Sequence, residues 1–121
     1  MELLLEYAPF AELLFLLLIG HAFADYPMQS DFIATAKNHT TELGKMFWKW
    51  VLPSHGLIHA LPVYVVTGSF VLAFAEFVCH TVIDWLKCDG RIGFNTDQLL
   101  HVGCKVLWVV LIALELPFLM E

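Results

Sequence analysis

Residues 70–87 of the 121-residue chain read FVLAFAEFVCHTVIDWLK. A helix that crosses a bilayer needs about 20 mostly apolar residues, so the stretch is long and apolar enough to be one. It nevertheless contains Glu76, His80 and Asp84 at intervals of four residues, which places them on one face of a helix. Ionisable side chains in a membrane span usually face the interior of a helix bundle and find partners there. The stretch therefore predicts an integral membrane bundle with a polar interior.

The composition of the whole chain agrees with a membrane protein. Hydrophobic residues make up 60% of the sequence and the mean hydropathy is +0.74, whereas soluble domains contain roughly 45–50% apolar residues. The net charge is −6, and the six Lys and Arg residues are dispersed, which excludes a basic nucleic-acid-binding face. The three cysteines form no CxxC motif, and we interpret them as packing residues.

Three further stretches, before and after residues 70–87, are candidate spans. The first runs from Pro9 to Ala24, with an extension back to Leu3 in its longest form; the second runs from Ser54 to Thr67, or from Met46 if the helix continues through Pro53; the last runs from Asp97 to Phe118. Residues 26–37 are expected to form a short interfacial helix, and Asn95 with Gln98 predicts a capping box at the start of the last span. We therefore expect an all-α bundle of four transmembrane helices, with a short interfacial helix after the first, in a single membrane domain over residues 1–121.

The distribution of charge predicts how this bundle is oriented. Five basic residues fall in the first and last connections, which lie on one side of a four-span bundle: Lys37, Lys45, Lys49, Lys87 and Arg91. The other side carries only acidic residues: Glu2, Glu6 and Glu121. Basic loops stay in the cytoplasm. We therefore expect a multi-pass membrane protein with both termini outside the cytoplasm.

Each expected span contains a pair of polar residues four positions apart. The pairs are His21 with Asp25, His55 with His59, His80 with Asp84, and Asp97 with His101. Residues at this spacing share one helix face. In the expected topology all four pairs also lie at the same depth, near the cytoplasmic boundary. We therefore expect the eight side chains to converge in one pocket, with Glu76 and Lys105 paired one turn deeper.

Imidazole and carboxylate groups are the ligands that zinc and similar divalent ions prefer. The expected metal ligands are His21, His55, His59, His80, Asp84 and His101. Asp25 and Asp97 are expected to be further ligands, outer-shell groups or the general base, with Gln98 beside them in the catalytic set. Gln29, Lys87 and Arg91 are expected to bind the substrate. The cluster has enough ligands for one metal with an outer shell or for two metals.

Three classes of function remain open from these residues. The first is a metal-dependent hydrolase that cleaves a lipid or lipid-linked ester or phosphoester, since a metal-bound water ionises near neutral pH. The second is transport of protons or divalent cations, which intramembrane His and acidic residues also serve. The third is a phage or host interaction protein whose polar network only holds the helices together. Membrane lipid and a second copy of the chain are the expected partners.

Four segments carry a resemblance to a known family. They are GHAFADYPMQSDFIATAK at 20–37, SHGLIHALPV at 54–63, HTVIDWLKC at 80–88 and FNTDQLLHVGCK at 94–105. The chain resembles, over these residues, an uncharacterised family of small bacterial and phage membrane proteins, domain of unknown function 3307. More distantly, the arrangement is similar to membrane-bound metal-dependent hydrolases. The HExxH motif of zincins is absent, so their mechanism is not implied.

Overall fold

The computed structural model describes residues 2–120, with side chains for residues 8–119. It contains the helices α1 (Glu2–Asp25), α2 (Asp31–Ala36), α3 (Glu42–Thr67), α4 (Phe70–Cys88) and α5 (Phe94–Ala113), followed by the short 3-10 helix η1 (Pro117–Met120). No strand occurs among the described residues, so the expected all-α class is confirmed. Glu121 and the side chains of Glu2 and Glu6, which entered the prediction of orientation, lie outside the described residues.

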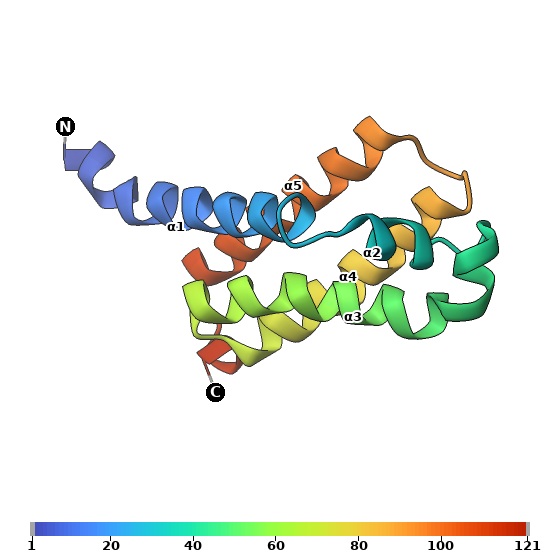
Figure 1. Ribbon diagram of the computed structural model, residues 1–121. Helices are drawn as coiled ribbons and strands as arrows, with labels where there is room; N and C mark the ends of the chain where they lie inside the picture. The colour runs from blue at the N-terminus through green and yellow to red at the C-terminus, as the bar shows by residue number, and fades with distance from the viewer. Residues whose placement is uncertain (1, 121) are drawn as a thin grey trace.

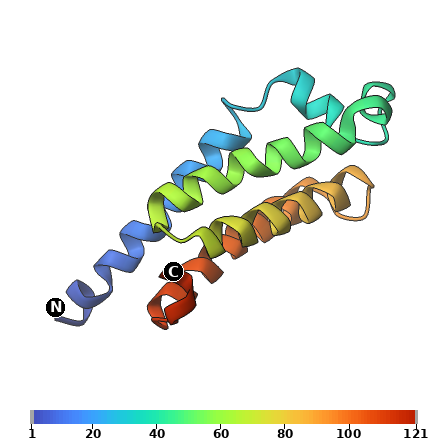
Figure 2. The same cartoon turned by 90° about the horizontal axis from the view of Figure 1, so that it is seen from below.

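The four long helices form one bundle (Figure 1). Helix α3 packs most extensively on α4, α1 packs on α3 and α5, and α4 packs on α5, so the helices form a closed ring in the order α1, α3, α4, α5. The short α2 packs on α3 at the end of the bundle that contains the connections before α3 and α5 (Figure 2). Side chains on the inner faces of all four helices therefore meet along one central axis.

Helix α3 is longer than the shorter form of the predicted second span, Ser54 to Thr67. It continues through Pro53 and Pro62 over 26 residues. Thr41 caps its first turn by accepting a hydrogen bond from the backbone N–H of Gly44. At the other end Gly68 has a φ of 70°, a left-handed conformation that glycine adopts without steric cost. This turn leads directly into α4, as the sequence predicts.

Two helix boundaries differ from the sequence-based expectation. The predicted capping box at Asn95 is wrong, because the N-cap of α5 is Gly93, which has no side chain to cap the helix. The side chain of Gln98 instead bonds to Asp25 and Asp97 inside the bundle. Helix α5 also ends at Ala113, before the predicted Phe118. Beyond it the chain turns at Glu115 (φ 53°), and η1 packs back against α4.

The interior of the bundle has an apolar half and a polar half. The apolar half is a cluster of buried side chains near the end of the bundle where α3 passes into α4: Leu17, Val63, Leu72, Trp108, Val109 and Leu119. The polar half lies towards α2 and contains most of the buried His, Asp, Glu and Lys side chains. The polar residues are therefore enclosed in protein, with an apolar plug at one end.

Two of the described helices, Ala8–Asp25 and Phe94–Ala113, are long and apolar enough to cross a membrane. The expectation of four spans is not confirmed by this criterion. Helices α3 and α4 contain several of the polar residues of the interior, such as His55 and His59 on α3 and Glu76 and Asp84 on α4. The side chains of these four residues are buried.

Candidate metal centre

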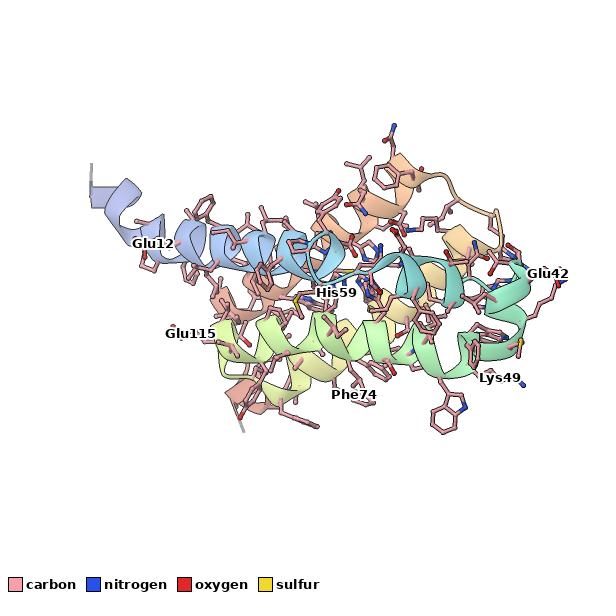
Figure 3. The ribbon with its side chains drawn as sticks, viewed as in Figure 1. Glu12, Glu42, Lys49, His59, Phe74 and Glu115 are labelled. Atoms are coloured by element: carbon pink, nitrogen blue, oxygen red, sulfur yellow. The ribbon has the colours of Figure 1, made fainter. Side chains whose placement is uncertain are left out.

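The four pairs of polar residues converge at the centre of the bundle. His59 lies in the middle of the structure in Figure 3, among side chains from the other long helices. Seven of the eight residues are buried, with exposures of 6% or less, and the side chain of Asp25 is 12% exposed. The seven are His21, His55, His59, His80, Asp84, Asp97 and His101. The predicted convergence follows from the ring of helices, because each helix directs one face to the shared axis.

The five imidazole rings are in contact with one another. The ring centroids of His59 and His80 are 3.5 Å apart, and those of His80 and His101 are 4.1 Å apart, with nearly parallel planes in both pairs. His55 lies edge-on to His59 at 4.7 Å, and His21 lies 5.2 Å from His59. Protonated imidazoles so close together would repel one another strongly. The packing is therefore suited to neutral rings, the form that binds metals.

Asp25 and Asp84 both lie close to ring nitrogens of the histidines. Asp25 Oδ1 lies 2.9 Å from His59 Nε2 and 3.3 Å from His55 Nε2. Asp84 Oδ2 lies 3.6 Å from His55 Nε2 and 3.7 Å from His80 Nε2. Of these four contacts, only the one between Asp25 and His59 has hydrogen-bond geometry. Nitrogen and oxygen lone pairs therefore point into shared space, as the ligands of a cation do.

Many of these buried polar atoms have no hydrogen-bond partner in the described part of the chain. Both ring nitrogens of four histidines are unpaired, as are His59 Nδ1 and Asp97 Oδ1; the four are His21, His55, His80 and His101. A buried polar atom without a partner costs free energy, so such a concentration of unpaired atoms in one place calls for a ligand. A divalent cation fits, because it accepts imidazole and carboxylate ligands together.

The side chains form two sets that could hold a metal ion. One set consists of Asp25, His55, His59 and His80, and the other of His80, Asp84 and His101; within each set the ligand atoms lie within 4.8 Å of one another. Five of the six expected ligands thus belong to a set. His21 belongs to neither and packs against the rings of His59 and His101, whereas Asp25, expected in several roles, joins the first set.

Two lysines flank the acidic side of the cluster. Lys37, at the end of α2, is buried, and its Nζ donates a hydrogen bond to Asp84 Oδ2 at 2.6 Å. Lys87 Nζ lies 3.3 Å from Asp84 Oδ1 and 3.6 Å from Asp97 Oδ2. From the sequence, Lys87 is expected near the substrate, whereas Lys37 is expected only as a basic residue of the first connection. Lys37 and Asp84 are 47 residues apart, so no local periodicity indicates their contact.

The remaining expected site residues lie at different distances from the cluster. Gln98 Nε2 donates to Asp97 Oδ2 at 3.0 Å and to Asp25 Oδ2 at 3.2 Å, and thereby links α5 to α1. Gln29 is half-buried, and its Oε1 is buried without a hydrogen bond to the described residues. Arg91 is exposed and lies outside the cluster, where it pairs with Asp89 at 2.8 Å.

A buried ion pair closes the cluster on the side of the apolar core. Lys105 donates to Glu76 Oε1, and Trp108 Nε1 donates to Glu76 Oε2 at 2.7 Å. Glu76 Oε1 also lies 3.9 Å from His80 Nδ1. The pairing of Glu76 with Lys105 confirms the sequence-based prediction. The hydrogen bond from Trp108 to Glu76 was not predicted.

A second polar contact ties the two connections together above the cluster. His39, which resembles an ordinary loop residue in the sequence, stacks on Trp85 at 4.9 Å, and its Nε2 lies 2.8 Å from Asp89 Oδ1. The neighbouring Arg91 and His39 lower the pKa of the Asp89 carboxyl. The connection before α3 is thus held against the end of α4, which keeps Lys37 over Asp84.

Comparison with known proteins adds one finding. A family model described as "Protein of unknown function (DUF3307)" matches residues 13–119. The matched region contains every residue of the cluster. A search of the curated proteins and a search of the solved structures gave no match.

Proposed function

The chain belongs to this DUF3307 family, and from its side chains we propose that it is a four-span protein of the bacterial inner membrane. In this proposal the His/Asp cluster binds a divalent metal, zinc being the first choice, and the protein hydrolyses a lipid or lipid-linked ester or phosphoester. The observation that carries the proposal is the set of unpaired imidazole nitrogens enclosed by four helices.

The surface of α3 and α4 supports placement of these helices in a membrane as well. Large apolar side chains are exposed along both helices, including Leu61 and Val65 on α3 and Phe70, Phe74 and Val82 on α4. Between residues 70 and 86 no charged side chain is exposed, since Glu76 and Asp84 point inward. A polar interior inside an apolar surface is the arrangement that a lipid environment stabilises. This pattern favours four spans, including the two helices of lower hydropathy.

The charges at the polar end of the bundle support an orientation. Lys45, Lys49 and Arg91 are exposed there, beside the connections before α3 and α5. We propose that this end faces the cytoplasm and that both termini lie outside, according to the positive-inside rule. The cluster would then lie below the level of the lipid head groups on the cytoplasmic side.

The residues around the cluster suit a hydrolytic reaction. A divalent metal bound there would supply Lewis acidity and lower the pKa of a bound water towards neutrality. Asp25 is the most exposed carboxylate of the cluster and would be the charged ligand of the metal, while Gln98 holds its carboxylate in position. Lys87, with a side chain 27% exposed, is placed to attract an anionic group from the head-group region.

A transport pathway is a weaker interpretation of the same residues. A conduit needs polar groups through the whole thickness of the bundle. Here the buried charged residues stop at Glu76 and Lys105, and the apolar cluster around Leu17, Val63 and Leu72 fills the interior beyond them. This arrangement supports a site open to one side.

The test is hydrolysis by the purified, zinc-loaded protein in liposomes, with released fatty acids and head groups measured by mass spectrometry. We expect slow cleavage of one lipid class by the wild type and its loss in Asp25→Asn. The matched control is Asp31→Asn, because Asp31 is exposed at the start of α2. Zinc bound in stoichiometric amount without turnover of any lipid class would overturn the hydrolase proposal.

A further inference from the structure

The polar interior contains more negative than positive charge. Four carboxylates lie in or against the cluster: Asp25, Glu76, Asp84 and Asp97. Three ammonium groups accompany them: Lys37, Lys87 and Lys105. One negative charge is therefore left over when the histidines are neutral. An uncompensated charge in such an interior costs free energy. The excess negative charge therefore indicates the charge of the ligand that the cluster binds.

The geometry locates the excess charge on Asp25. Lys105 pairs with Glu76, and Lys37 and Lys87 lie against Asp84 and Asp97. The carboxylate of Asp25 contacts only imidazole rings and the Gln98 amide among the described residues. Asp25 is also the charged member of the four-residue ligand set. The uncompensated negative charge therefore lies within the larger of the two ligand sets.

From this balance we infer that the cluster takes up one divalent metal together with one monoanionic group of a substrate, such as a phosphodiester or a carboxylate. The inference rests on the proposed metal function and specifies the substrate class. One divalent ion turns the excess of one negative charge into an excess of one positive charge, which a monoanion neutralises. Two divalent ions would leave three positive charges in the same interior, so the second ligand set, which shares His80 with the first, is not filled at the same time.

The position of the cluster agrees with a ligand that enters from the polar end. Asp25 and Lys87 have the most exposed side chains among the charged residues in or against the cluster, at 12% and 27%. On the opposite side Glu76, Lys105 and Trp108 are almost completely buried. A monoanion would therefore approach past Asp25 and Lys87.

The first test uses cobalt(II), whose visible absorption reports its ligands, on the full chain in detergent micelles. We expect saturation at one equivalent of cobalt. Azide and diethyl phosphate, both monoanions, should then change the spectrum, whereas neutral triethyl phosphate should not. No cobalt binding would overturn the proposed metal function itself. Saturation at two equivalents, or a spectrum unaffected by both anions, would overturn the present inference and leave the metal function standing.

The second test changes the charge balance through Lys87. In Lys87→Met the excess becomes two negative charges, which one divalent ion neutralises alone. We expect azide to bind about tenfold more weakly, since the nearby positive charge that attracts the anion is gone, while cobalt still binds. Lys87→Met combined with Asp97→Asn restores the original balance and should restore azide binding. Weak azide binding in the double variant would show that Lys87 contacts the anion directly and would overturn the argument from charge.

Discussion

Lys105 on α5 donates a hydrogen bond to the carboxylate of Glu76 on α4, and each residue is 1% exposed. The second oxygen of Glu76 accepts a hydrogen bond from Trp108, and the first lies 3.9 Å from His80 Nδ1. The pair therefore connects the histidine cluster with the apolar core. Because its charges are enclosed on all sides, its stability depends on both partners being present.

We expect each single variant, Glu76→Gln and Lys105→Met, to lower the free energy of unfolding by about 3–5 kcal/mol, since each leaves one buried charge without its partner. The double variant should lose less than the sum of the two single losses, because it contains neither charge. Thermal unfolding in detergent, followed by circular dichroism, measures the coupling. Glu12→Gln is the control, because Glu12 is exposed. Strictly additive losses would rule out an energetic coupling between Glu76 and Lys105.

The buried pair of Lys37 and Asp84 fixes α2 to the bundle. We expect Lys37→Met to destabilise the protein by about 3–5 kcal/mol and to expose residues 26–41 to protease, because Asp84 loses its closest cation. The matched control is Lys45→Met. Lys45 pairs with Glu42 on the surface, with side chains 59% and 91% exposed, and such pairs contribute about 0–1 kcal/mol. Equal effects of the two substitutions would contradict a structural role for Lys37.

The proposed topology predicts which loops a membrane-impermeant thiol reagent can reach. In a variant without the three native cysteines, Thr40→Cys should react only from the cytoplasmic side, because Thr40 is exposed beside the connection before α3. Glu115→Cys, at the opposite end of the bundle, should react only from the outside. Reaction of both positions from the same side would exclude four spans in this orientation.

The sequence contained enough information to predict the centre of the site. A spacing of four residues on four helices fixes which faces are polar, and the alternation of chain direction fixes their common depth. The prediction therefore placed His59, His80 and Asp84 together without any knowledge of distances. It also found the pair of Glu76 and Lys105, because a short connection makes α4 and α5 antiparallel neighbours.

Other contacts had no such local signal. Lys37 reaches Asp84 only because α2 folds back over α3, and His39 stacks on Trp85 only because the two connections meet. The end of α5 was missed because Leu114, Leu116 and Phe118 continue the apolar sequence of the helix, whereas the turn depends on the positive φ of Glu115. Interactions that depend on the path of a loop cannot be read from helical periodicity.

The zinc content of the purified protein, supplied with zinc during preparation, measures whether the His/Asp cluster binds a metal. We expect about one equivalent of zinc per chain in the wild type, because folding brings the ligands Asp25, His55, His59 and His80 together from three helices. The control His39→Ala should retain it, since His39 lies outside the cluster. The triple variant His59→Ala, His80→Ala and His101→Ala should contain no zinc while keeping its helical circular dichroism. A full equivalent of zinc in the folded triple variant, or a wild type that never binds zinc, would contradict the account.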